Sequence, residues 1–352
     1  MKPILLTALA LGLGAGQTLQ TDYTKERSLT VTVSSSSESK TTAMEMTLDG
    51  EPVERGGGGG GFMGGGSSAK RSYSFTDSVL ATKDGAPTKV KRTFGEVGGS
   101  MTRPGRDGET ETDLESAFTD AVVVIDASGD EVKVEVVDGK LDDEQTKGLS
   151  TTLLIDHLLH DGEVEAGEAW ELSGEDVLAA FGLGLERQLY RRPAPEGGGQ
   201  GRGGQGGRGQ GRPGGMMGGG SELAMLADGD WDAKAKLTEE TEEVDGVECA
   251  VIELAFEVSG EMPDRGFGGG RGRDRAFGLE GTPRANTYEA EFEGKLLWSI
   301  AEARPVQLHL TGKLETEMNS ERESDRGVMS MHREQETTFE LHVSVTAGPK
   351  GE

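Results

Sequence analysis

Four carboxylates between residues 228 and 239 have the spacing of a calcium-binding loop. Asp228, Asp230 and Asp232 alternate with other residues, and Glu239 follows eleven positions after the first of them. Carboxylates spaced in this way converge on a hard cation in EF-hand loops. Ala233, however, stands where such a loop requires glycine, and the residues after it also fit a strand that would separate the acids. Two interpretations stay open, a calcium site and a polar turn that leads into a strand.

Two histidines form a second candidate metal site. His157 and His160 are three residues apart in a segment with helical periodicity, so both rings could reach one zinc ion. The sequence offers no third ligand and no HExxH motif. Histidines at the C-terminal end of a helix, where the helix dipole favours a positive charge, explain the pair equally well.

No motif identifies a catalytic residue or a cofactor site. Cys249, the only cysteine, lies in the apolar run 247–258 beside acidic residues, so we expect a buried and unreactive thiol. The segments 37–40 and 67–70 match SxxK but lack the accompanying SDN and KTG motifs, and the chain has no GxSxG or P-loop motif. We therefore expect no cofactor and rank a hydrolase with an undetected acid pair or metal site last.

Three glycine-rich tracts, residues 56–66, 197–220 and 266–272, hold 29 of the 57 glycines. Ordering such tracts costs entropy and buries little apolar surface, so we expect loops. The second tract carries Arg202, Arg208 and Arg212 without an acid, and it resembles the RGG segments of RNA-binding proteins. Because it lacks stacking aromatics and the chain has a net charge of -27, we exclude nucleic acid as a partner. Contact with an anionic polymer of the cell envelope is the alternative.

The first 16 residues predict export. Lys2 precedes an apolar run over residues 4–13, and residues 14–16 are small, which is the pattern of a cleaved signal peptide. The run is too short to span a bilayer, so we expect no transmembrane segment and a periplasmic or extracellular location.

The composition predicts one β-rich domain, residues 17–346, followed by a short disordered tail, residues 347–352. The 352-residue chain is 33% hydrophobic and 5% aromatic, so its core must come mainly from aliphatic side chains. The acidic balance favours solubility and disfavours anionic membrane surfaces.

Period-two alternation of apolar and polar residues is the dominant pattern. It predicts strands over residues 132–136, 250–258, 288–292, 306–314 and 339–345, with tight hairpins at Asp245-Gly246 and Ser128-Gly129. Leucines four apart predict one helix from about Asp142 to His160, and Ser173 is the expected N-cap of another. We expect a mainly β, α+β fold in which a large curved antiparallel sheet or half-barrel packs on one or two helices.

Three segments resemble exported bacterial β-rich proteins: Gly167-Glu168-Ala169-Trp170 after residues 163–165, the stretch 246–253, and 294–298 followed by Arg304-Pro305-Val306. The order of strands and helices is also similar to the half-barrel of periplasmic lipoprotein carriers such as LolA and LppX. That resemblance implies an apolar cavity between sheet and helices and transfers no site residue.

Two functions are expected from these observations. The first is a non-enzymatic envelope protein that binds a hydrophobic or amphipathic ligand or an envelope component. The second is an interaction module that uses its Gly/Arg-rich loops. An apolar cavity between sheet and helices would favour the first, whereas a filled interface would leave the loops and the outer face as working surfaces.

Overall fold

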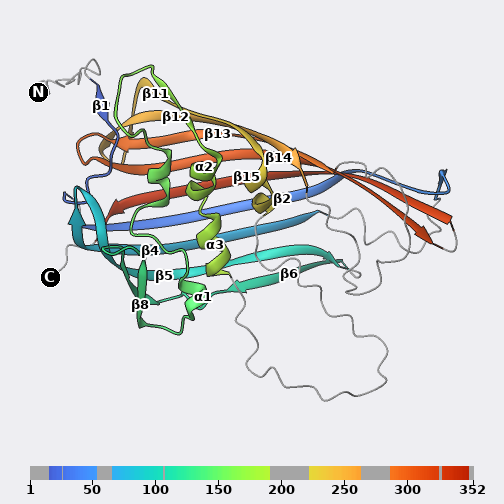
Figure 1. Ribbon diagram of the computed structural model, residues 1–352, viewed down its shortest axis with the longest axis horizontal. Coiled ribbons are helices and arrows are strands. Elements are labelled where there is room, and N and C mark those ends of the chain that lie inside the picture. Colours follow the sequence, from blue (N-terminus) through green and yellow to red (C-terminus); the bar gives the residue numbers. More distant parts are fainter. Residues whose placement is uncertain are drawn as a thin grey trace, which may run out of the picture.

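The structure is a computed structural model and describes residues 16–25, 27–53, 66–105, 108–190, 222–262, 286–324 and 327–348. Within these residues, one antiparallel sheet of 13 strands carries five short helical segments on one of its faces (Figure 1). The predicted fold class is therefore confirmed. The signal peptide, all but Gly66 of the three glycine-rich tracts, and the end of the C-terminal tail lie outside the described residues.

The strands follow one another across the sheet in the order β10-β11-β12-β13-β14-β15-β2-β4-β5-β7-β8, with β3 beside β2 and β6 beside β5. Strands on both sides of residues 191–221 therefore share one sheet. Their bounds are β2 (Ser28–Leu48), β3 (Glu51–Pro52), β4 (Ser67–Lys83), β5 (Ala86–Gly105), β6 (Gly108–Glu115), β7 (Val122–Asp126), β8 (Lys133–Asp138), β10 (Ala169–Leu172), β11 (Asp230–Val244), β12 (Val247–Glu261), β13 (Thr287–Ser299), β14 (Arg304–Ser324) and β15 (Gly327–Ala347). A separate two-stranded sheet joins β1 (Gln17–Thr18) to β9 (Glu163–Val164).

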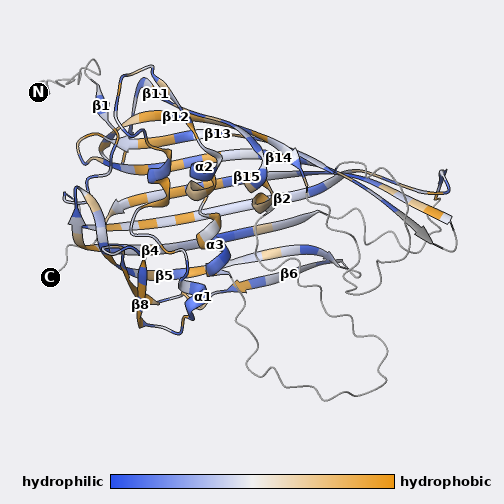
Figure 2. Cartoon of the chain, in the orientation of Figure 1, coloured by the Kyte–Doolittle hydropathy of each residue, from blue (hydrophilic) through white to orange (hydrophobic). Residues whose placement is uncertain are grey.

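The period-two pattern gives this sheet one buried and one exposed face. On β12 the alternating residues from Ala250 to Val258 are all buried, and Glu253 and Glu257 between them are exposed. Figure 2 shows the same banding of apolar and polar residues along the neighbouring strands. We call the face that carries the helices the inner face and the opposite one the outer face.

Tight turns join several of the strands. Asp245 and Gly246 both have positive φ, 51° and 83°, as a two-residue hairpin requires, so this predicted turn is confirmed. The predicted tight turn at Ser128-Gly129 is wrong, because β7 and β8 are separated by residues 127–132. The Asp126 carboxylate accepts hydrogen bonds from the backbone and hydroxyl of Ser128, which holds a wider turn.

The expected helix from Asp142 to His160 is also wrong. The chain forms the single turn α1 (Asp143–Thr146) and, after a loop, the 3-10 segment η1 (Leu154–Leu158). Gly148, with φ of 84°, follows α1, and Ser and Thr residues over 150–152 disfavour a helix. Leu149 and Leu153 are nevertheless buried. Leucines at this spacing are therefore compatible with a buried loop as well as with a helix.

The helix expected at Ser173 is confirmed as α2 (Gly174–Ala180), and the Ser173 hydroxyl accepts a hydrogen bond from the Asp176 backbone amide. Gly182, with φ of 69°, joins it to α3 (Leu183–Leu189). The 3-10 segment η2 (Glu222–Asp228) precedes β11. None of the helices in the described part is long and apolar enough to cross a membrane. We refer to residues 142–160 and 173–190, which include α1, η1, α2 and α3, as the helical cover; β9 and β10 lie between these two parts and do not belong to it.

Candidate functional site

The interface between the inner face and the helical cover is closed by apolar side chains. The Phe181 ring at the end of α2 packs against Phe256 and Phe292 of the sheet, with ring centroids 6.2 and 5.0 Å apart. The side chains of Leu153, Ile155 and Leu158, in and just before η1, are also buried and belong to the same apolar core. The cavity expected here is therefore occupied by the protein's own side chains at Phe181.

The helical cover has little stability of its own. Its helical segments are four to seven residues long, and helices shorter than about 12 residues are marginal in water without tertiary contacts. Contacts with the inner face must therefore hold the cover in place. Two polar clusters also hold the cover: one joins η1 to the N-terminal segment, and the other joins α3 to the inner face.

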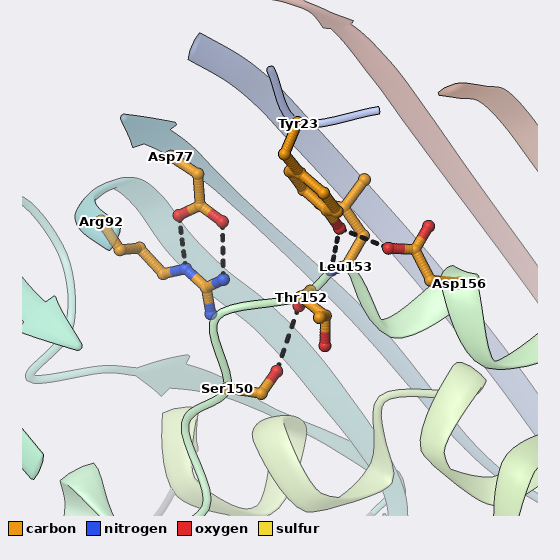
Figure 3. Close-up of polar contacts among 7 residues, drawn as sticks. All are labelled: Tyr23, Asp77, Arg92, Ser150, Thr152, Leu153 and Asp156. Atoms are coloured by element: carbon orange, nitrogen blue, oxygen red, sulfur yellow. Dashed lines mark hydrogen bonds and ion pairs between the residues drawn. The ribbon is translucent and has the colours of Figure 1, made fainter. Parts of the chain in front are cut away.

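The first cluster ties η1 to the N-terminal segment (Figure 3). The Tyr23 hydroxyl donates a hydrogen bond to Asp156 and accepts one from the Leu153 backbone amide, and Thr21 donates to Asp156 over 2.6 Å. Burial raises the pKa of the Asp156 carboxyl from 3.8 to about 6, even though these two hydroxyls and His157 act to lower it. The cover thus contains a buried carboxylate without a cationic side chain bound to it.

Beside this cluster, Arg92 on β5 forms a complete ion pair with Asp77 on β4, its direct neighbour across the sheet (Figure 3). The Nε and Nη2 atoms of Arg92 each lie 2.7 Å from an Asp77 carboxylate oxygen. The guanidinium also lies 4.1 Å from the centroid of the Phe75 ring. Both charges are buried and satisfied by each other, so this pair is part of the sheet's core.

The second cluster lies under α3 and is incomplete. Arg71 on β4 faces Glu186 on α3, with 3.8 Å between Nη1 and Oε2. The Ser35 hydroxyl donates to the other Glu186 oxygen over 2.9 Å. Burial raises the pKa of Glu186, and Arg71 acts against that rise. Nε of Arg71 is buried and has no hydrogen-bond partner among the described residues.

This cluster marks a change in polarity along the inner face. On β2, the buried residues Leu29, Val31 and Val33 are followed on the same face by Ser35, Ser37 and Ser39. On the paired strand β15, Val343 and Leu341 lie opposite Val33 and Ser35, and Thr337 lies opposite Ser39. The inner face is therefore apolar on one side of Arg71, whereas on the other side hydroxyl groups lie among the apolar residues Ala69 and Phe339.

The outer face carries charged side chains and a broad hollow of about 1230 Å³. Glu257 lies directly opposite Glu291, and Glu291 lies opposite Lys313, and all three line this hollow. The hollow is lined by charged residues of the outer face together with Phe256, Phe292 and Phe339, so it is not the closed apolar cavity that was expected under the helices. Cys249 belongs to a small apolar cluster with Val251, Leu297 and Val306, and burial raises its pKa to about 11, as expected for an unreactive thiol.

The four acids of the candidate calcium loop are all exposed and lie at the start of β11 and along it. Asp228 ends η2, and Asp232 forms an ion pair with Lys234 over 2.8 Å. Seven residues of strand place Asp232 and Glu239 about 20 Å apart. The structure therefore does not bring the four carboxylates together.

The two candidate histidines also have separate surroundings. Nδ1 of His157 lies 3.4 Å from an Asp176 oxygen at the N-terminus of α2. The His160 ring packs edge-on against Trp170, with centroids 5.6 Å apart. Within the described residues, no group of three or more His, Cys, Asp and Glu side chains is placed to hold a metal ion.

Sequence reasoning did not identify the two polar clusters. Arg71 and Asp77 interrupt an apolar series on β4 that contains Tyr73, Phe75 and Val79, and this interruption was a usable signal. The partners of the inner-face groups come from segments far along the chain, such as Glu186, and no local pattern reveals them.

No family model and no curated protein matches this chain. Among solved structures, the outer membrane protein OprG from Pseudomonas aeruginosa aligns with a TM-score of 0.20 and 5% identity, over 94% of this chain and 100% of its own. A Pseudomonas aeruginosa FadL homologue aligns with a TM-score of 0.22 and 9% identity, over 93% of this chain and 92% of its own. The P. putida toluene transporter TodX aligns with a TM-score of 0.14 and 6% identity, over 91% of each chain.

These comparisons correct two expectations. The structures matched are outer-membrane proteins and transporters, so the resemblance to the lipoprotein carriers LolA and LppX does not hold. The expectation of no transmembrane segment stands against these matches, which include an outer membrane protein and a transporter. Because all three TM-scores are low, the geometry of this chain alone carries the functional inference that follows.

Proposed function

We propose that this chain is a non-enzymatic envelope protein that binds a hydrophobic or amphipathic ligand between the inner face of its sheet and its helical cover. The contact of Phe181 with Phe256 and Phe292 is the observation that carries the proposal. A single ring from a short helix fills a position over the wide apolar face of the sheet. A ligand chain that displaced this ring would find the same apolar partners.

The shortness of the helical segments in the cover supports this function. A second sheet or a long helix would bury the inner face permanently, because many contacts would have to break at once. Here the cover consists of short segments, with a glycine of positive φ, Gly182, between α2 and α3. Each segment is therefore held on the sheet by its buried side chains, such as Val177 and Leu189, and not by its own backbone. By itself the filled interface would favour the loops and the outer face as working surfaces, so this proposal requires that the closed interface is the ligand-free state and that it opens when a ligand binds.

The test uses the neutral apolar probe N-phenyl-1-naphthylamine, whose fluorescence rises on transfer from water to an apolar site. Phe181→Ala removes the ring that closes the interface, so we expect probe binding several-fold tighter than in the natural chain. Phe118→Ala is the matched control. Phe118 is fully buried against Phe94, with centroids 5.0 Å apart, but it is not part of the cover.

The two variants lose similar packing energy, about 3–5 kcal/mol each, so general loosening would affect both equally. Equal probe binding by the two variants contradicts a site under α2. Native mass spectrometry of the protein purified without organic solvent supplies the second readout. A natural chain that binds no probe and carries no apolar molecule overturns the proposed function.

A further inference from the structure

Arg71 is a buried cation whose hydrogen bonds are only partly satisfied. Its side chain is 10% exposed, yet its contact with Glu186 is long, at 3.8 Å, and its buried Nε lacks a partner among the described residues. Burying a guanidinium is costly unless hydrogen bonds and an opposite charge compensate it. Nothing in the fold of β4 requires an arginine at this position, because Ala69 and Tyr73 are its neighbours on the same face.

The ion pair of the adjacent strand shows what a complete arginine site looks like in this protein. Asp77 binds Arg92 with two oxygens at 2.7 Å. Glu186, by contrast, turns one oxygen toward Ser35 and leaves the guanidinium of Arg71 a single long contact. The planar guanidinium binds carboxylates and phosphates best through two parallel hydrogen bonds. Arg71 therefore retains unused capacity for an anion.

The surroundings of Arg71 define the kind of anion that fits. On one side the inner face is apolar, with Val33, Tyr73 and Leu341, and on the other the hydroxyl groups of Ser37 and Thr337 lie beside Phe339. A molecule with an apolar chain and an acidic head would match this change in polarity. A free inorganic anion would use only the arginine and leave the adjoining apolar face covered by the protein itself.

We propose that Arg71 binds the acidic headgroup of an anionic amphiphile, which replaces Glu186, while the apolar chain lies on the inner face under the helical cover. The headgroup is a carboxylate or a phosphate monoester. Glu186 is then an internal substitute for the ligand's acid, so exchange of the two anions releases α3 from the sheet. This inference rests on the proposed function and specifies its ligand class.

The experiment measures displacement of N-phenyl-1-naphthylamine by three ligands with the same chain length: dodecanoate, dodecyl phosphate and dodecanol. In the natural protein we expect at least one of the two anions to bind about 10-fold tighter than the alcohol, as a charge-assisted hydrogen-bond pair would give. The comparison between dodecanoate and dodecyl phosphate identifies the preferred acid. Arg71→Met should reduce anion binding to the level of dodecanol and leave dodecanol binding unchanged.

Two further variants keep the test decisive if Arg71→Met does not fold. Glu186→Gln removes the competing carboxylate, so we expect the anions to bind several-fold tighter. Arg71→Lys keeps the charge but loses the planar pair of donors, and it should weaken anion binding, whereas the matched Arg92→Lys should not. An unchanged preference for anions in the Arg71 variants overturns this inference alone. Failure of all three ligands to displace the probe, or failure of the probe to bind, overturns the proposed function as well.

Discussion

Asp156 allows a quantitative prediction about the stability of the helical cover. Its carboxylate is partly buried in η1, where two hydroxyl groups bind it and no lysine or arginine among the described residues forms an ion pair with it. Asp156→Asn replaces it with a neutral group of the same size. The substitution removes the titration and keeps an oxygen that can accept one of the two hydroxyl hydrogen bonds.

The sign follows from the raised pKa. The folded protein holds the Asp156 proton up to about pH 6, whereas the unfolded chain releases it near 3.8. Between these values the folded state binds more protons, so the free energy of unfolding falls as the pH rises and then levels off above pH 6. The difference between the two pKa values corresponds to about 3 kcal/mol. Ionised Asp156 thus destabilises the closed cover at neutral pH.

Urea unfolding between pH 4 and pH 7.5 provides the assay, because tryptophans lie both beside the cover, at Trp170, and in the sheet, at Trp298. The quantity that matters is the unfolding free energy of Asp156→Asn minus that of the natural protein. We expect this difference to rise by about 2.5 kcal/mol from pH 4 to pH 7.5, because part of the full effect lies below pH 4. Titrating groups that do not interact with Asp156 affect both proteins equally and cancel in this difference.

Glu186→Gln serves as the control for a second buried carboxyl, since burial raises the Glu186 pKa as well. It should show a difference of the same sign, and it should not change the effect at Asp156. The reasoning is refuted if the difference between Asp156→Asn and the natural protein stays constant across this range, or if it falls as the pH rises.

Three further substitutions test the packing of the fold by urea unfolding. Arg92→Met should destabilise the protein by about 3–5 kcal/mol, because it leaves Asp77 buried without its partner. Ser173→Ala should cost about 1 kcal/mol through loss of the α2 N-cap, and wild-type stability in this variant would contradict the cap. Gly312→Ala should cost about 1–3 kcal/mol, since the added Cβ would lie 2.1 Å from the Phe292 ring, and an unchanged midpoint would contradict that close contact.

The strands could be predicted because their signal is local. Alternation from Ala250 to Val258 places one face of β12 in the core whichever strands lie beside it. The Asp245-Gly246 turn fixes the register with β11 as far as Thr241, beyond which a bulge shifts the pairing. The helical cover could not be predicted in the same way. Leu149 and Leu153 need only be buried, and an irregular loop under tertiary constraint buries them as well as a helix does.

The candidate site was less accessible to prediction for a related reason. Abundant acids suggested metal sites by spacing alone, as for Asp228 and Glu239, although an extended strand separates such residues. The polar groups that matter for the inner face are single interruptions in apolar patterns, such as Arg71 in β4. Their chemistry depends on partners such as Glu186, which only the folded chain brings near.

The two carboxylates of the helical cover lead to one conclusion about how it opens. Asp156 in η1 is bound by the N-terminal segment and Glu186 in α3 by the sheet, and burial raises the pKa of each. Burial therefore disfavours the ionised form of each acid in the closed state. Apolar contacts such as that of Phe181 oppose this cost. An amphiphile that supplies its own apolar chain and its own acid would replace both kinds of contact at once, so ligand binding and release of the cover would be a single exchange.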